Sequence, residues 1–227
     1  MNALFMAGAG TDVGKTFVAA QLIRALIGRG VVVEALKPVV SGFDPGDWAL
    51  SDPGQLLAAL GRPLDAETLQ AISPWRYAAP LSPDMAARLE GRAVDCAAVA
   101  AFCRSRIAAR PEALTLVEGA GGVMSPVDED TTGLDLMAGI GAPVVVVGGS
   151  YLGAISHTLT AIEAVRARGL TLKAVVVSES QAAGTPFAET VAAVARLGRA
   201  SPVIAAPRQA GDLAWREALA EAVLRPG

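Results

Sequence analysis

The segment Gly8-Ala-Gly-Thr-Asp-Val-Gly-Lys-Thr16 combines spaced glycines with a lysine and a hydroxyl side chain. It follows the apolar run Ala3–Ala7 and precedes apolar residues at helical spacing. A strand that ends in a glycine-rich turn and leads into a helix leaves backbone N–H groups pointing at one place, where the helix dipole also favours negative charge. Lys15 is then expected to reach the outer phosphates of a nucleotide, and Thr16 to bind Mg²⁺. The segment therefore predicts a site for a nucleoside triphosphate.

The glycine spacing of this segment departs from the usual phosphate-binding loop. The usual motif has its first glycine about five residues before the second, a position that Ala9 takes here. The glycine lies one residue earlier, at Gly8, six residues before Gly14. We therefore expect a loop that is one residue longer than usual.

Continuous apolar runs alternate with helical patterns along the chain. Such runs are typical of strands that are buried on both faces of a parallel sheet. The order of elements therefore predicts an α/β protein with one domain over residues 1–227, in the three-layer α/β/α fold of P-loop NTPases with a mostly parallel central sheet. The predicted strands are Ala3–Ala7, Val31–Leu36, Leu114–Val117, Val144–Val147, Leu172–Val177 and Val203–Ala205. The helices predicted after the first are Asp52–Leu60, Asp95–Ala109, Asp135–Ile140, Ile155–Arg168, Pro186–Leu197 and Leu213–Leu224.

Two segments lack periodicity and are expected to be functional loops. Residues 38–52 follow the second predicted strand, and residues 73–84 are rich in proline. Long loops that follow strands commonly carry function. Ligands of open α/β sheets bind outside the carboxyl ends of the strands. The site is therefore expected at these strand ends.

Three charged side chains are expected near the glycine-rich segment. Glu118 follows the predicted strand Leu114–Val117, and its carboxylate is a hard oxygen ligand of the kind that Mg²⁺ prefers. Thr16, Glu118 and one further acid such as Asp52 would suffice for an ion that keeps several waters. Lys37 precedes a proline and is therefore extended at its strand end, where its charge would stabilise a transferring phosphoryl group. Simpler interpretations stay open: a solvated acid for Glu118, a helix-capping role for Asp52 and an exposed loop lysine for Lys37.

Two further segments have glycines or a helix start that could approach a ligand. Gly119–Gly122 consists of glycine and alanine, which lets a backbone lie close to a bound molecule. The segment Gly153-Ala-Ile-Ser156 opens a predicted helix, whose free N–H groups could bind a second anion such as a substrate carboxylate. An ordinary helix cap explains this second segment equally well.

Composition argues against several functional classes. The net charge is −3 without a cluster of Lys and Arg, which disfavours binding to nucleic acid or anionic lipid. No apolar run approaches the ~20 residues that span a bilayer, and no targeting segment precedes the glycine-rich segment; we expect a cytoplasmic protein with small-molecule partners.

Cys96 and Cys103 lie two helical turns apart, too far for a disulfide, and are expected to be reduced thiols. His157 has no obvious partner for metal binding or catalysis and is expected to pack or cap a helix.

Six motifs together resemble the dethiobiotin synthetase family in order and spacing, over nearly the whole chain. The unusual glycine spacing belongs to that family's loop. The motifs are Gly8 to Thr16, Lys37-Pro-Val-Val-Ser-Gly42, Ser51-Asp52, Ser82-Pro83, Val117-Glu-Gly-Ala-Gly-Gly122 and Leu152-Gly-Ala-Ile-Ser-His157.

The resemblance implies an ATP-dependent cyclo-ligase. In this family 7,8-diaminononanoate takes up CO₂ at one amine as a carbamate, the carbamate oxygen attacks the γ-phosphate of ATP, and the second amine displaces phosphate from the mixed anhydride. The product is the cyclic urea dethiobiotin, formed with ADP and phosphate. The resemblance further implies Mg²⁺ as the metal, ATP as co-substrate, and a homodimer with the active site at the subunit interface.

The resemblance also implies roles for individual residues. Lys15 and Lys37 would be catalytic, because they would stabilise the carbamate and phosphoryl charges. The implied substrate contacts are Ser41 for the diamine end and, from the neighbouring subunit, Gly153, Ala154 and Ser156 for the carboxylate. The implied metal ligands are Thr16, Asp52 and Glu118. The implied nucleotide contacts are Asp12, Val13, Gly14, Lys15, Thr16, Phe17, Asp52, Glu118, Gly119, Ala120, Gly121, Ser178, Glu179, Ala205, Ala206 and Pro207.

Two positions depart from the family pattern. Ser178-Glu179 stands where the family usually has Asn-Asp to read the adenine ring, and Gly10 stands where an acid is frequent. One hydroxyl makes fewer directed hydrogen bonds than a bidentate amide. Ser178 is therefore expected to discriminate among nucleobases less well.

Two other ATP-dependent classes are alternatives. Partition and cell-division ATPases carry a loop lysine four residues before the second glycine, where this chain has Gly10. They also often end in a basic amphipathic helix, whereas Leu213–Leu224 with the adjacent Arg225 carries acids and bases in equal number. Cobyrinate-type ligases add a glutaminase domain, for which 227 residues leave no room. A P-loop ATPase switch of the partition type is the alternative function.

Overall fold

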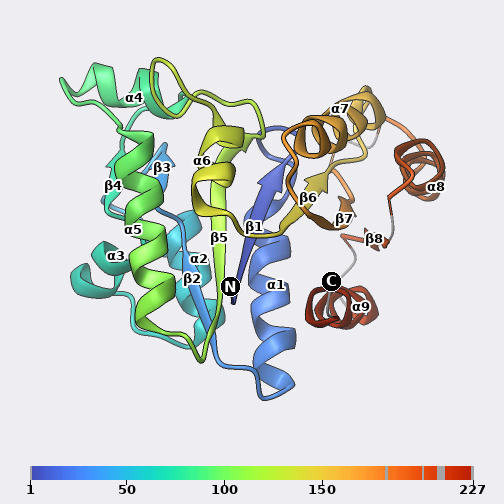
Figure 1. Cartoon of the computed structure of the whole chain (residues 1–227), viewed down its shortest axis with the longest axis horizontal. Coiled ribbons are helices and arrows are strands. Elements are labelled where there is room, and N and C mark those ends of the chain that lie inside the picture. Colours follow the sequence, from blue (N-terminus) through green and yellow to red (C-terminus); the bar gives the residue numbers. More distant parts are fainter. Residues whose placement is uncertain (1, 182–183, 201, 209–212, 226–227) are drawn as a thin grey trace.

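The main sheet of the protein is parallel and contains the predicted strands. The computed structural model describes residues 2–181, 184–200, 202–208 and 213–225. Within these ranges six strands pair in the order β2–β5–β1–β6–β7–β8 (Figure 1). Their bounds are β1 (Ala3–Gly8), β2 (Val33–Leu36), β5 (Leu114–Gly122), β6 (Val144–Gly148), β7 (Leu172–Ser178) and β8 (Val203–Ala206). All six strands expected from the apolar runs are confirmed.

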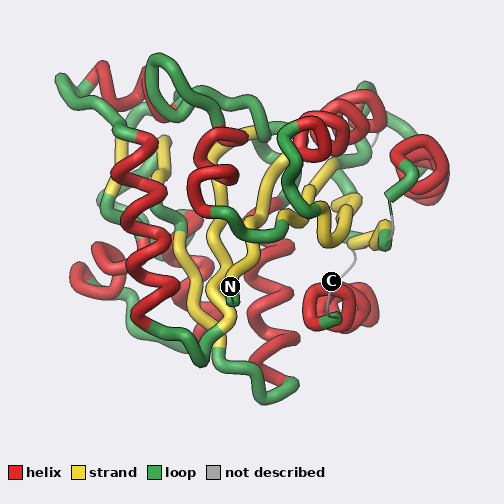
Figure 2. The backbone as a smooth tube through the Cα atoms, viewed as in Figure 1, coloured by secondary structure: helices red, strands yellow, loops and turns green. Residues whose placement is uncertain are grey.

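Helices cover both faces of this sheet and give the predicted three-layer α/β/α fold. On one face α1 contacts α2 and α9, and on the other α5 contacts α6 while α7 contacts α8 (Figures 1 and 2). The helix bounds are α1 (Lys15–Gly28), α2 (Asp52–Leu60), α5 (Cys96–Ala109), α6 (Gly133–Ile140), α7 (Ala154–Ala167), α8 (Phe187–Gly198) and α9 (Ala214–Leu224). None of the described helices is both long and apolar enough to cross a membrane.

The burial of the central strands explains why their sequences are continuously apolar. Val144, Val145, Val146 and Val147 of β6 are all fully buried. Since consecutive side chains of a strand point to opposite faces, such a run requires packing on both sides of the sheet. The helices of both outer layers supply that packing.

Each of the two segments expected to be irregular contains a short strand, so the expectation that they lack regular structure throughout was wrong. β3 (Val39–Ser41) and β4 (Trp75–Tyr77) form a separate two-stranded parallel sheet. The helices α3 (Ala66–Ile72) and α4 (Pro83–Leu89) flank β4 along the chain. Each of these strands is three residues long, too short to show periodicity, and its partner is distant in sequence. This small sheet holds Ser41 at the carboxyl end of β3.

The strand that carries Glu118 is longer than predicted. β5 continues through the glycine run to Gly122, so Glu118 lies inside the strand instead of after it. β5 pairs with β1, and Met6 is opposite Glu118 in the register. The register shifts between Met6 and Gly8, where the glycine-rich loop begins. The neighbouring strands therefore place the Glu118 carboxylate beside that loop, as the sequence predicts.

Candidate functional site

The glycine-rich loop links β1 to α1 and has two positions that accept only glycine. A Cβ atom on Gly8 would lie 2.7 Å from the Gly10 carbonyl oxygen, 2.8 Å from that of Gly121 and 2.9 Å from Cδ of Lys15. Gly14, the residue before α1, has φ 86°, in the left-handed region that glycine adopts without strain. The structure thus explains the unusual spacing, because the crowding falls at Gly8 and not at Ala9.

Lys15 begins α1 and folds back over the loop. Its Nζ donates a hydrogen bond to the Gly10 carbonyl at 3.0 Å, and the residue is buried. Burial lowers the pKa of Lys15, and the positive charge of Lys37 lowers it further, to about 8. An ammonium group held this way is a strong donor for an anion that enters the loop.

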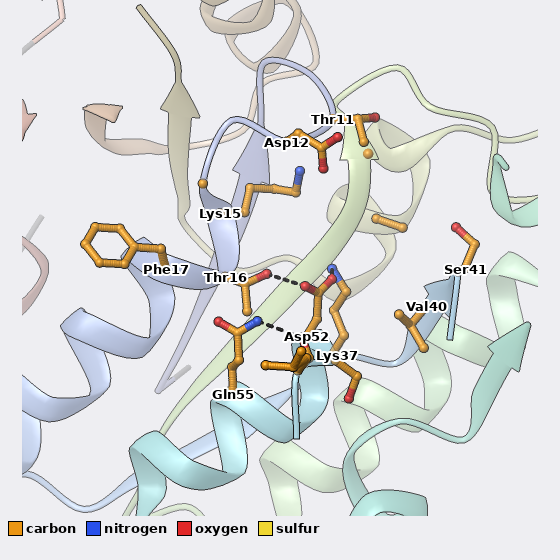
Figure 3. Close-up of a pocket in the computed structure, with 16 residues that line it drawn as sticks. Thr11, Asp12, Lys15, Thr16, Phe17, Lys37, Val40, Ser41, Asp52 and Gln55 are labelled. Atoms are coloured by element: carbon orange, nitrogen blue, oxygen red, sulfur yellow. Dashed lines mark hydrogen bonds and ion pairs between the residues drawn. The ribbon is translucent and has the colours of Figure 1, made fainter. Parts of the chain in front are cut away.

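The three predicted metal ligands converge beside Lys15. The Thr16 hydroxyl lies 2.8 Å from Oδ1 of Asp52 and 2.7 Å from Oε1 of Glu118. A hydroxyl has one proton, so it donates to one carboxylate at a time. Figure 3 shows the Thr16 and Asp52 side chains pointing toward each other from α1 and α2.

The start of α2 fixes the place of Asp52. The side chain of Ser51 caps this helix by accepting a hydrogen bond from the Gly54 backbone N–H at 3.2 Å. Asp52 is therefore the first helical residue and is left free to point at the loop, so the alternative that it serves only as a cap is not what the structure shows. Asp52 is also favourably placed in the first turn, where the helix dipole stabilises negative charge.

Lys37 is almost fully buried, with 2% of its surface exposed, and contacts both carboxylates. Its Nζ lies 2.7 Å from Oε1 of Glu118, 2.9 Å from Oδ2 of Asp52 and 3.0 Å from the Gly119 carbonyl oxygen. Burial by itself lowers the pKa of Lys37, but the charges of Glu118 and Asp52 outweigh it, so the pKa is raised. Burial likewise raises the pKa of Asp52, but the charge of Lys37 outweighs this and the pKa is lowered. Lys37 is thus a buried ammonium group paired with two carboxylates and not an exposed loop lysine.

The donor set fits a magnesium ion. It consists of one hydroxyl and two carboxylates, and Mg²⁺ prefers oxygen ligands and keeps several waters. Oε2 of Glu118 is buried and has no hydrogen-bond partner among the described residues. A buried carboxylate oxygen without a partner is costly unless a cation or donor reaches it. This oxygen is therefore available to a metal ion.

A cleft of about 470 Å³ is lined by Lys15, Thr16, Lys37 and Asp52, but not by the buried Glu118. Its lining brings together segments that are far apart in the sequence. Of the other predicted site residues, Asp12, Gly14, Phe17, Ser41, Ala120 and Gly121 also line it. Thr11, Leu50 and Gln55 line the cleft as well, and sequence reasoning missed them. Gln55 lies one turn of α2 beyond Asp52, and this helical spacing is the one sequence feature from which Gln55 could have been predicted.

A second cavity lies on the other side of residues 11–14, at the ends of β7 and β8. Ser178 and Glu179 line it together with Val13, as predicted, and with Tyr151 and Arg208, which sequence reasoning missed. The Ser178 hydroxyl faces the loop, since a Cβ atom on Gly14 would lie 2.7 Å from its Oγ.

The predicted nucleotide contacts Ala205, Ala206 and Pro207 do not line this second cavity. The Glu179 backbone N–H donates to the Ala206 carbonyl oxygen at 3.0 Å. The Glu179 side chain is also held, because its Oε2 accepts a hydrogen bond from the Arg208 backbone N–H at 2.8 Å.

The predicted anion-binding residues lie apart from both cavities, at the start of α7. Gly153 precedes the helix with φ 95°, Ala154 is buried and Ser156 is exposed. Neither cavity is lined by these three residues. His157 is exposed, and its Nδ1 lies 2.8 Å from Oη of Tyr151.

The fold and the loop geometry together define a P-loop nucleotide-binding protein of the α/β class. A family model described as an AAA domain matches residues 2–216. Proteins named ATP-dependent dethiobiotin synthetase from Phenylobacterium zucineum and Caulobacter vibrioides are 53% and 49% identical to this chain. These matches cover 98% and 92% of the chain, and 95% and 93% of the relatives. The chain belongs to the dethiobiotin synthetase family, which confirms the resemblance seen in its motifs.

Solved structures with a similar fold include an ATPase and a cell division protein complex. A ParA family ATPase from Chlorobium tepidum has a TM-score of 0.54 at 16% identity, over 98% of this chain and 91% of that chain. The MinC:MinD cell division complex from Aquifex aeolicus has a TM-score of 0.54 at 12% identity, over 95% and 85%. At these identities the likeness concerns the fold alone. It supports the predicted P-loop NTPase fold and gives no support to a switch function.

Proposed function

We propose that this protein is an ATP-dependent cyclo-ligase that converts 7,8-diaminononanoate and CO₂ into dethiobiotin. The single observation that carries the proposal is its identity of 53% to a protein named ATP-dependent dethiobiotin synthetase, over 98% of the chain. The cleft supports it, because the phosphate-binding loop, two lysines and two of the three proposed metal ligands, Thr16 and Asp52, line the same space. Phosphoryl transfer requires this kind of positioning and charge neutralisation.

The proposed reaction has three bond-forming steps. One amine of the diamine attacks CO₂ and loses a proton, which gives a carbamate. A carbamate oxygen attacks the γ-phosphorus of ATP, the bond to the β-phosphate oxygen breaks, and ADP leaves. The second amine attacks the carbonyl carbon of the mixed anhydride, phosphate leaves with its bridging oxygen, and loss of a proton completes the cyclic urea.

The residues of the cleft have distinct proposed roles. The loop N–H groups and Lys15 hold the phosphates of ATP. Lys37 neutralises the charge of the carbamate and of the transferring phosphoryl group, and Ser41 at the end of β3 orients the diamine. None of these steps needs a covalent nucleophile, which agrees with the burial of both cysteines, Cys96 and Cys103.

Thr16, Asp52 and Glu118 are the residues that would hold Mg²⁺ in this proposal. When bound there, the ion supplies charge neutralisation for the phosphates. These three protein oxygens would leave other coordination positions of the ion to water.

Three finer features belong to the same proposal. The protein is a homodimer in which Gly153, Ala154 and Ser156 receive the substrate carboxylate of the neighbouring subunit. Residues that contact the substrate of the neighbouring subunit would lie outside the cavities of their own subunit, and these three residues line neither cavity. Residues 1–227 act as one ligase domain, and the protein works in the cytoplasm.

A direct assay tests the proposed activity. The protein is incubated with ATP, Mg²⁺, bicarbonate and 7,8-diaminononanoate, and dethiobiotin and phosphate are measured by mass spectrometry and phosphate release. We expect both products in equal amounts, and none when any one substrate is left out. ATP hydrolysis that does not depend on the diamine, or the absence of both products, would reject the assignment.

A further inference from the structure

The ammonium group of Lys37 already uses all of its protons in this structure. It has three donors, and three acceptors surround it: Oε1 of Glu118 at 2.7 Å, Oδ2 of Asp52 at 2.9 Å and the Gly119 carbonyl oxygen at 3.0 Å. The side chain is 3% exposed. No donor is left for a substrate or a phosphoryl group while these contacts persist.

Two of these acceptors are also proposed metal ligands. Oε1 of Glu118 is shared between Lys37 and the Thr16 hydroxyl, and Asp52 contacts Thr16 through Oδ1 and Lys37 through Oδ2. The ammonium therefore lies in the space between the two carboxylates, where it neutralises charge that would otherwise attract a divalent ion. A metal ion bound by the same carboxylates would lie within a few ångströms of this positive charge, and such repulsion is strong in a buried site.

We propose that Lys37 is the built-in counter-ion of the metal site and keeps divalent metal affinity low until a nucleotide is bound. The phosphates of the nucleotide provide new acceptors for the ammonium, so that Lys37 leaves the carboxylates when the metal arrives with its nucleotide. Movement of the Lys37 side chain thereby couples metal binding to the positioning of its ammonium group beside the phosphates. This inference rests on the proposed function only for the identity of the metal ligands.

Binding of Mn²⁺ without nucleotide tests the inference. Mn²⁺ is a spectroscopic probe for a magnesium site, and its free concentration can be followed by electron paramagnetic resonance in titrations of wild type and Lys37→Met. We expect the variant to bind Mn²⁺ roughly tenfold to a hundredfold more tightly, because one buried positive charge next to the ion is removed. Unchanged or weaker binding would overturn the inference.

Two control variants separate charge from packing. Lys37→Arg keeps the positive charge and is expected to bind Mn²⁺ as weakly as wild type does; tight binding by this variant would contradict the inference. Lys173→Met removes a lysine that donates to the Arg225 carbonyl, away from the cleft, and should leave Mn²⁺ binding unchanged. Tighter Mn²⁺ binding by Lys173→Met would show a general effect of net charge and would contradict a specific role of Lys37.

Thermal unfolding provides a second measurement if Lys37→Met folds poorly. Removing Lys37 leaves Asp52 and Glu118 without their cation, which destabilises the metal-free protein. A ligand that binds the folded state raises its stability with concentration, so Mn²⁺ should raise the melting temperature of the variant more than that of wild type. An equal or smaller rise would overturn the inference. Neither measurement uses ATP or the diamine, so its result is independent of whether dethiobiotin is formed.

Discussion

The two cavities on either side of the phosphate loop differ in how their polar groups are arranged. In the cleft beside α2, charged side chains are buried and bound to one another, as in the contacts of Lys37 with Asp52 and Glu118. In the cavity at the ends of β7 and β8, the Ser178 hydroxyl packs against the loop and the Glu179 carboxylate is held by a backbone N–H. The charged side chains of the first cavity are therefore paired with one another, whereas Glu179 in the second cavity is held by a backbone group.

This difference suggests different roles for the two cavities. Charges buried in a low-dielectric environment interact strongly with a developing charge, so we expect the reaction to be accelerated in the cleft beside α2. We expect the cavity beyond the loop mainly to hold one end of the nucleotide. Substitutions in the first cavity should therefore change rates steeply, and changes in the second should alter affinity modestly.

The largest effect is expected for Lys37→Gln. Loss of the ammonium should lower the rate of dethiobiotin formation by about 10²–10³-fold, the usual cost of removing one group that stabilises transition-state charge. Nucleotide affinity, measured by titration calorimetry, should fall much less than the rate does, because the loop and Lys15 still hold the phosphates when the contact from Lys37 is lost. The matched control Lys173→Gln should keep wild-type rates. Unchanged turnover in Lys37→Gln would remove this residue from the reaction.

A smaller effect is expected for Asp52→Asn. The amide keeps the shape of the carboxylate but loses its charge, so the Mg²⁺ concentration needed for half-maximal activity should rise by about 10–100-fold. Asp47→Asn serves as the control, since the Asp47 side chain is exposed and accepts a hydrogen bond from the Leu50 backbone N–H in its own turn. Equal Mg²⁺ requirements in the two variants would show that Asp52 is not a metal ligand.

A further contrast compares the stability effects of two glycines, Gly8 in the loop and Gly28 at the far end of α1. Gly8→Ala should destabilise the fold by about 1–3 kcal/mol, because the new Cβ would overlap backbone atoms. Gly28→Ala at the end of α1 should be neutral or slightly stabilising, because a Cβ there has no atom within 4 Å. Urea unfolding measures both free energies. Equal stability of the two variants would contradict the crowding at Gly8.

The smallest effect concerns the choice of nucleobase in the cavity beyond the loop. A bidentate amide contact typically discriminates by about 1–3 kcal/mol, and Ser178 cannot supply one. The dissociation constants of the triphosphates of adenosine, guanosine and cytidine should therefore differ by no more than roughly tenfold, which corresponds to the free energy of about one such contact. Calorimetric titrations would reveal a preference of a hundredfold or more, and that result would show that a group other than Ser178 reads the base.

Local sequence patterns predicted the main sheet but not the small one. The buried run Val144–Val147 is long enough to identify β6 by itself, and the loop motif placed Lys15 and Thr16 correctly. β3 and β4 depend on each other, because Val39 pairs with Trp75 across a long stretch of chain. Such a pairing leaves no local periodicity to read.

Site residues could be predicted where the residue type itself indicates a function. They could not be predicted where tertiary packing determines which side chains meet. Glu118 and Asp52 could be proposed as ligands because carboxylates near a phosphate loop suggest a metal. The contact of Lys37 with both carboxylates could not be foreseen, since it depends on how β2, β5 and α2 meet. Tyr151 was missed for the same reason, because only the fold brings it beside the loop.

The fate of the oxygen atoms of CO₂ tests the proposed reaction most directly. In the proposed sequence a carbamate oxygen becomes the bridge to phosphorus and leaves with phosphate when the ring closes. With CO₂ labelled with ¹⁸O and a reaction time shorter than exchange with water, mass spectrometry should find one labelled oxygen in each phosphate released, together with an equal amount of dethiobiotin. Phosphate without label, formed alongside dethiobiotin, would contradict phosphorylation of the carbamate.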